Sequence, residues 1–127
     1  MLIRIALAFC TALLFSAGAF AAEPIKIGVV STLTGPYAEW GTFQVNGLKL
    51  ALEDINKAGG ILGRQVELRI EDNGSTNPGT VLAFSKLASE GGITAIIGPI
   101  RSTQIQAASP TIAKSGMPRK IAMSSVA

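Results

Sequence analysis

The chain contains no histidine, and its single cysteine, Cys10, lies near the N-terminus. A Ser-His-Asp triad and a zinc site of cysteine and histidine are therefore excluded. The sequence also contains neither G-x-G-x-x-G nor G-x-x-x-x-G-K-[ST], the glycine-rich patterns that bind dinucleotide and nucleotide phosphates. Two acidic pairs, Glu53-Asp54 and Glu71-Asp72, are adjacent in the chain, so their side chains diverge and cannot act on one substrate. We expect neither a cofactor nor a metal, and no enzymatic activity.

An excess of charge of either sign is missing too. The chain has 11 Lys and Arg residues against 8 Asp and Glu residues, a formal net charge of +3. Arg4 is the only charged residue among the first 21, so the other residues carry ten basic and eight acidic side chains. Such a balanced surface does not indicate a nucleic-acid partner.

The first 21 residues have the three-part layout of a secretory signal. Arg4 supplies the positive charge, an apolar run follows from Ile5 to Phe15, and Ala19-Phe20-Ala21 forms an A-x-A cleavage site. The apolar run is shorter than the roughly 20 residues of a membrane-spanning helix. We predict an exported, periplasmic protein in which residues 1–21 are removed and residues 22–127 form the mature chain.

Strand and helix patterns alternate along the rest of the chain. Strands are predicted at residues 25–31, 65–72, 93–97 and 120–123. Helices are predicted at residues 43–58, from 77 to about 91, and from about 102 to 115, and Asn77 is predicted to be the N-cap of the second helix. This order predicts an α/β fold, a doubly wound parallel sheet with right-handed crossovers. The polar and apolar alternation of 65–72 favours an edge strand, and the continuous apolar run of 93–97 favours a central one.

Ligands of such sheets bind beyond the carboxyl ends of the strands, which makes the loops STLTGPYAEWG, GPIRSTQ and MSSVA the candidates. Trp40, the only tryptophan, is predicted to lie in the first loop between Gly35 and Gly41, where either packing or ligand contact explains it. Ser102 is predicted at the start of the third helix, where its hydroxyl caps the helix or receives a carboxylate. Asp72, at the end of the second strand, is interpreted as a structural loop acid.

Three segments together resemble a known family. They are the TGPYAEWG loop, the block N-G-x-x-x-A-x-x-x-I-N-x-x-G-G-I-x-G from Asn46 to Gly63, and IIGP at 96–99. From about Ile25 to Ile112 the chain resembles the amino-terminal part of the substrate-binding proteins of branched-chain amino-acid ABC transporters, the leucine-binding class. The resemblance implies the type I periplasmic binding protein fold, in which two lobes close on a ligand.

The resemblance also implies which residues bind the ligand. Trp40 matches the aromatic residue that lies against the ligand side chain, and Tyr37 belongs to the same loop. Ser102 matches the hydroxyl that receives the α-carboxylate. The second ligand loop, which offers a backbone carbonyl and a hydroxyl to the ammonium and carboxylate, matches Met123, Ser124 and Ser125. Arg101 stands where the family usually has a small or a polar neutral residue, and it either favours an extra anionic or amide group on the ligand or is a solvent-exposed charge.

Members of this family are much longer than this chain. The resemblance therefore implies a partial amino-terminal lobe over 22–127 with the second lobe absent, and we expect weak or no binding, because ligand sites normally bury most of the ligand. The implied partners are an amino acid, amide or related solute and the membrane permease of an ABC transporter, and the intact protein is expected to be a monomer. The alternative is a free-standing small exported α/β module that senses a ligand or binds another protein.

Overall fold

The computed structural model describes residues 22–116 and 121–122, which form a parallel sheet of four strands. The strands are β1 (Ile25–Ser31), β2 (Val66–Asp72), β3 (Ile93–Ile97) and β4 (Ile121–Ala122), in the spatial order β2-β1-β3-β4. β2 pairs with β1 over seven residues and stands at an edge of this sheet, while β3 lies between β1 and β4. The predicted parallel sheet and both strand positions are confirmed.

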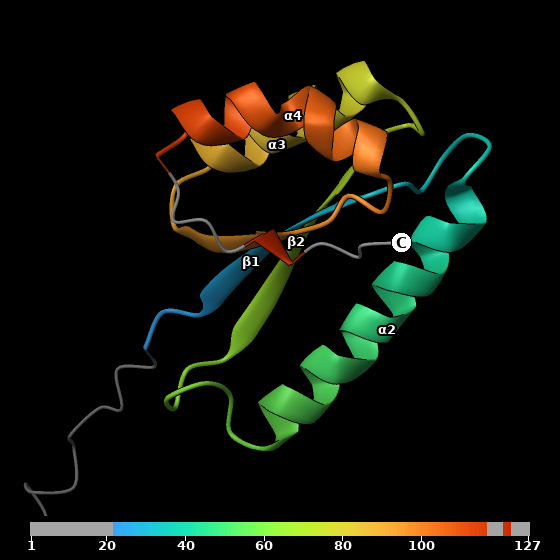
Figure 1. Ribbon diagram of the computed structural model, residues 1–127. Helices are drawn as coiled ribbons and strands as arrows, with labels where there is room; N and C mark the ends of the chain where they lie inside the picture. Colours follow the sequence, from blue (N-terminus) through green and yellow to red (C-terminus); the bar gives the residue numbers. More distant parts are fainter. Residues whose placement is uncertain (1–21, 117–120, 123–127) are drawn as a thin grey trace, which may run out of the picture.

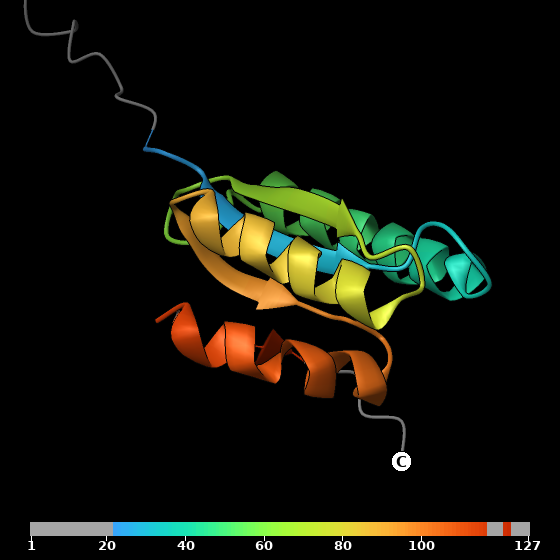
Figure 2. The same cartoon turned by 90° about the horizontal axis from the view of Figure 1, so that it is seen from above.

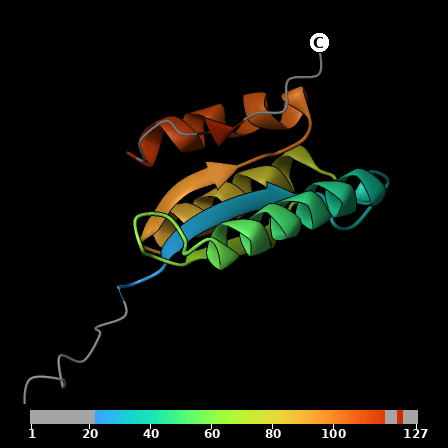
Figure 3. The ribbon, with the colours of Figure 1, turned by 90° about the horizontal axis from the view of Figure 1, so that it is seen from below.

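Helices cover both faces of the sheet. α2 (Ala38–Lys57) packs on one face, and α3 (Asn77–Ser89) and α4 (Ser102–Lys114) pack side by side on the other (Figures 1 and 2). Seen from below, α2 runs along β1 on the side of the sheet opposite to α3 (Figure 3). The doubly wound arrangement is thereby confirmed, since right-handed crossovers in opposite directions must place their helices on opposite faces.

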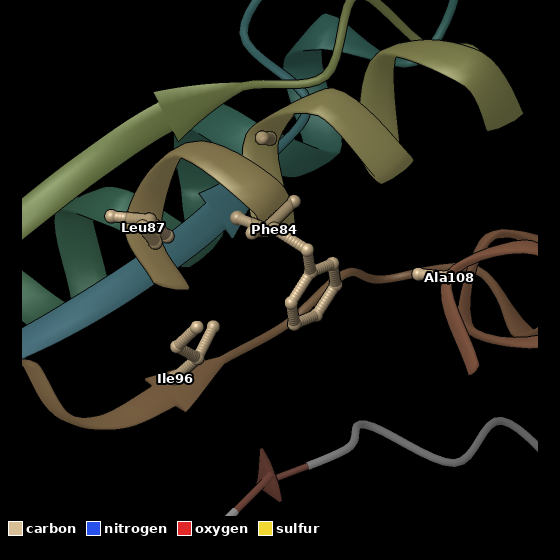
Figure 4. Packing of buried hydrophobic residues seen from close by; sticks show 6 residues of the cluster. Phe84, Leu87, Ile96 and Ala108 are labelled. Carbon is tan, nitrogen blue, oxygen red and sulfur yellow. The ribbon is translucent and has the colours of Figure 1, made fainter. Parts of the chain in front are cut away.

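The core lies between the sheet and the α3–α4 layer. Val30 and Ile96 from the sheet meet Ala83, Phe84 and Leu87 of α3 and Ala108 of α4 (Figure 4). Phe84 and Leu87 are at most 2% exposed, and burying a side chain of this size contributes about 2–3 kcal/mol.

The start of α2 differs from the prediction. The helix begins at Ala38 rather than Phe43, so Trp40 lies in its first turn and not in a loop. The physical reason is Gly41, which is buried where the helix crosses the end of β1, because a Cβ atom there would be 1.8 Å from the carbonyl oxygen of Thr32. Gly41 is therefore required by a close approach of two backbones, whereas the sequence suggested a loop boundary.

The start of α3 is corrected by one residue. Thr76, not Asn77, is the N-cap, and its hydroxyl accepts a hydrogen bond of 3.0 Å from the N–H of Gly79. Asn77 and Pro78 are the first helical residues. Because proline lacks an N–H, it costs nothing at a position whose N–H has no partner in the helix.

Candidate functional site

A cavity of about 310 Å³ opens at the carboxyl edge of the sheet, between the start of α2 and the start of α4. It is lined by Thr32, Tyr37, Trp40, Ile100, Arg101, Ser102 and Thr103. Trp40 is 60% exposed, which is unusual for so large an apolar side chain and leaves one wall open to solvent. The volume suits a small solute, since ligand cavities start at about 300 Å³.

Asp72 holds the loop between β1 and α2 in place. Its Oδ1 accepts hydrogen bonds from the N–H groups of Leu33 (2.8 Å) and Gly74 (2.9 Å), and its Oδ2 accepts one of 2.6 Å from the hydroxyl of Thr34. A single carboxylate thereby ties the end of β2 to the loop that precedes Tyr37. The interpretation of Asp72 as a structural loop acid is confirmed.

The pKa of Asp72 reflects this arrangement. Partial burial raises the pKa of the carboxyl, but the hydrogen bond from Thr34 and those from the backbone of Gly74, Leu33 and Thr34 lower it by more. The pKa therefore lies below its ordinary value. Hydrogen bonds to the charged form favour ionisation, so Asp72 is ionised at neutral pH and the loop contacts are fully formed there.

Two further side chains from the β2–α3 loop fasten the same segment. The hydroxyl of Thr32 donates a hydrogen bond of 2.9 Å to Oδ1 of the buried Asn73. The hydroxyl of Ser75 donates one of 2.6 Å to the carbonyl of Thr34 and accepts one of 3.3 Å from the N–H of Tyr37. Tyr37 and Trp40 form the aromatic wall of the cavity. Hydrogen bonds to the β2–α3 loop therefore hold the segment that carries this wall.

The opposite wall is the start of α4. The turn before it contains Gly98, whose φ of +95° is a conformation that side chains disfavour. The N-cap residue is Arg101, whose side chain makes no capping hydrogen bond. Of the two roles that the sequence left open for Ser102, capping is therefore wrong, and the binding of a carboxylate stays a prediction. Ser102 is the first helical residue, and the first N–H groups of a helix have no partner inside the helix. Within the described residues, the N–H groups of Ser102 and Thr103 have no backbone partner, so this end of α4 offers donors and the positive end of the helix dipole to an anion.

Arg101 places a positive charge at the same wall. Its guanidinium carbon lies 4.2 Å from the centroid of the Tyr37 ring, which is the geometry of a cation–π contact. This contact joins the α4 wall to the aromatic wall. Among the residues that the structure describes, no three or more Asp, Glu, His or Cys side chains group as a metal site would require.

Three of the predicted site residues line this one cavity: Tyr37, Trp40 and Ser102. Met123, Ser124 and Ser125 lie outside the described residues. Thr32, Ile100 and Thr103 also line the cavity. They belong to the two predicted ligand loops after β1 and β3, but the sequence did not single them out as site residues. In residues 22–116 and 121–122, no helix is long and apolar enough to cross a membrane.

The sequence of this chain is similar to those of several characterised binding proteins. It is 37% identical over 93 residues to the Leu/Ile/Val-binding protein BraC3 of Rhizobium johnstonii, a match that spans 73% of this chain and 25% of that protein. It is 36% identical over 103 residues to the Leu/Ile/Val-binding protein of Escherichia coli, over 81% of this chain and 28% of that protein. The chain thus spans about a quarter of the length of these relatives.

Solved structures of substrate-binding proteins are similar to this chain as well. The substrate-binding protein LivJ of a branched-chain amino-acid transporter from Streptococcus pneumoniae, in complex with isoleucine, superposes with a TM-score of 0.72 at 33% identity. That alignment covers 79% of this chain and 28% of the other. A leucine complex of an ABC transporter substrate-binding protein from Desulfitobacterium hafniense gives a TM-score of 0.66 at 28% identity, over 80% of this chain and 28% of that one.

The sequence profile of the family supports the same assignment over most of the chain. Residues 24–120 match the profile described as periplasmic binding protein. This range includes the strands β1, β2 and β3, the helices α2, α3 and α4, and every residue that lines the cavity, and it ends just before β4. Together with the sheet order and the position of the cavity, this match shows that the chain belongs to the periplasmic binding protein family.

Proposed function

We propose that the protein binds a branched-chain amino acid, an amide or a related small solute for an ABC transporter, and that it is not an enzyme. The observation that supports this most directly is the meeting of Tyr37, Trp40 and Ser102 at one cavity on the carboxyl edge of the sheet. The names of the relatives point the same way, because they state that those proteins bind leucine, isoleucine and valine. Family membership favours this function over the free-standing sensory module.

In this proposal the ligand carboxylate lies at the start of α4. The N–H groups of Ser102 and Thr103 and the hydroxyl of Ser102 donate hydrogen bonds to it, aided by the helix dipole. The apolar side chain of the ligand lies against Trp40 and Tyr37, whose exposed faces lose contact with water on binding. Met123, Ser124 and Ser125 are proposed to complete the site from the loop that follows β4.

This wall by itself encloses only part of a ligand. Because Trp40 remains open to solvent on one side, much of the apolar surface of a bound amino acid stays hydrated. We therefore expect the 22–127 chain alone to bind weakly, with a Kd of about 1 mM, equal to about −4 kcal/mol. Tighter binding, delivery to a permease and function as a monomer in the periplasm are proposed for a protein in which a second lobe closes the site.

The test is a titration of the 22–127 chain with isoleucine, followed by the fluorescence of Trp40, the only tryptophan. We expect a saturable change in the millimolar range. Replacing Ser102 with Ala should weaken binding about tenfold, because a hydrogen bond to a charged group contributes about 1.5 kcal/mol or more.

The matched control is Ser109→Ala in the same helix, where the hydroxyl donates only to the carbonyl of Ile105. This variant should bind like the unaltered chain. A titration that gives no saturable signal, or one that both serine variants alter equally, would contradict the proposed role of the α4 start.

A further inference from the structure

Arg101 differs from the other arginines that the structure describes because its guanidinium has no oxygen partner there. Arg64 donates from Nε to the carbonyl of Glu23 at 2.7 Å, and Arg69 pairs with Glu90 at 3.1 Å. Arg101 instead contacts the ring of Tyr37. Its positive charge is therefore not neutralised by a carboxylate within the described residues.

The contact with Tyr37 orients Arg101 without using its hydrogen-bond donors. A cation–π contact arises from the positive charge of the guanidinium and needs none of its five N–H groups. Arg101 and Tyr37 both line the cavity. The guanidinium is therefore held at the cavity wall with donors that remain available to a carboxylate, which arginine binds through two parallel hydrogen bonds.

No acidic side chain balances this charge at the cavity. The other lining residues are three hydroxyl-bearing residues, two aromatic residues and Ile100. The acidic residue Glu39 lines an adjoining hollow, which shares Trp40 and Ile100 with the cavity. A ligand ammonium group in the cavity would thus meet the positive charge of Arg101 and the positive end of α4, while a carboxylate is attracted by both.

We propose that Arg101 makes this site selective for an anionic carboxylic acid with an apolar body over the zwitterionic amino acid of the same skeleton. The inference rests on the proposed binding function and specifies its ligand class, of which branched-chain 2-oxo acids are examples. Leucine and 4-methyl-2-oxopentanoate share the same branched side chain and carboxylate and differ only in the group at C2. The pair therefore tests the replacement of a positively charged ammonium group by a neutral carbonyl group.

The experiment measures the affinity of the 22–127 chain for each of the two compounds from the shift of the Trp40 indole N–H resonance. Arg101→Gln, which removes the charge, is compared with Lys114→Gln, which removes an exposed charge from the far end of α4. We expect the unaltered chain to bind the 2-oxo acid about fivefold more tightly than leucine, the upper range for a partly exposed ion pair. Arg101→Gln should abolish this preference, and Lys114→Gln should preserve it.

Added salt gives a second measurement that requires no variant. Raising the ionic strength should weaken binding of the 2-oxo acid more than that of leucine, because only the former has a net charge to be screened. Equal affinities on the unaltered chain, or a preference that persists in Arg101→Gln, would overturn the inference while leaving the binding function intact. If neither compound shifts the resonance, the proposed function itself is wrong.

Discussion

At the scale of single residues, two glycines of α2 have opposite surroundings. A Cβ atom on Gly41 would be 1.8 Å from the carbonyl oxygen of Thr32, whereas one on Gly47 would have no atom within 4 Å. Gly41→Ala should therefore lower the free energy of unfolding by about 1–3 kcal/mol through steric overlap. Gly47→Ala should raise it by about 0.5–1 kcal/mol, because alanine favours a helix interior. Urea unfolding measures both values, and two changes of the same sign would refute the close approach of α2 to β1.

Asp72 gives a prediction about pH. The pKa of Asp72 is lower in the folded protein than the value of about 3.9 in an unfolded chain. The ionised carboxylate therefore stabilises the fold above about pH 3.9, and this stabilisation is lost as the pH falls through the pKa of the folded state. Asp72→Asn should cost about 1 kcal/mol at neutral pH through weaker hydrogen bonds. The difference from the unaltered chain should shrink below about pH 3.9.

Asp54→Asn is the matched control for this measurement. Asp54 lies on the exposed side of α2, and no side-chain hydrogen bond or ion pair involves it within the described part of the chain. Its replacement should change the unfolding free energy by less than about 0.5 kcal/mol at any pH. A thermal unfolding series from acid to neutral pH distinguishes the two, and parallel pH profiles would count against the role of Asp72.

At the scale of the elements, the packing of α3 against α4 and the sheet depends on Phe84. This side chain is 2% exposed, whereas Phe43 on α2 is 66% exposed. Phe84→Ala should lower the free energy of unfolding by about 3–5 kcal/mol, because it leaves a cavity in the core. Phe43→Ala should change it by about 0.5 kcal/mol or less. Chemical unfolding checks the pair, and similar costs would show that the core is not where the structure places it.

The strands were easier to predict than the helix starts. β1 and β3 match the predicted 25–31 and 93–97, because branched apolar runs bounded by turn residues are local signals. The predicted start of α2 lies five residues too late, because Gly41 resembles a loop residue in the sequence, whereas its small size serves a contact with Thr32. A contact between residues nine positions apart, such as Gly41 and Thr32, leaves no periodic pattern in the sequence.

At the scale of the whole molecule, the sequence predicted the sheet, its two helical layers and three lining residues of the cavity. The sequence did not predict the hydrogen bonds that Leu33 and Thr34 donate to the carboxylate of Asp72, because these residues are 39 and 38 positions from Asp72 and meet it only in the folded chain. The position of Arg101 over Tyr37 was hidden for the same reason. The approximate site followed from the rule for parallel sheets, while the orientation of its side chains required the structure.

For the whole molecule, we propose that a small carboxylate ligand binds between the start of α2 and the start of α4. The most direct measurement is a series of ¹H–¹⁵N correlation spectra of the 22–127 chain with increasing isoleucine. We predict saturable shifts of the Trp40 indole and of the amides of Ser102 and Thr103, and unchanged amides at the opposite edge of the sheet. Shifts that avoid these three residues, or spectra that do not change at all, would contradict this proposal.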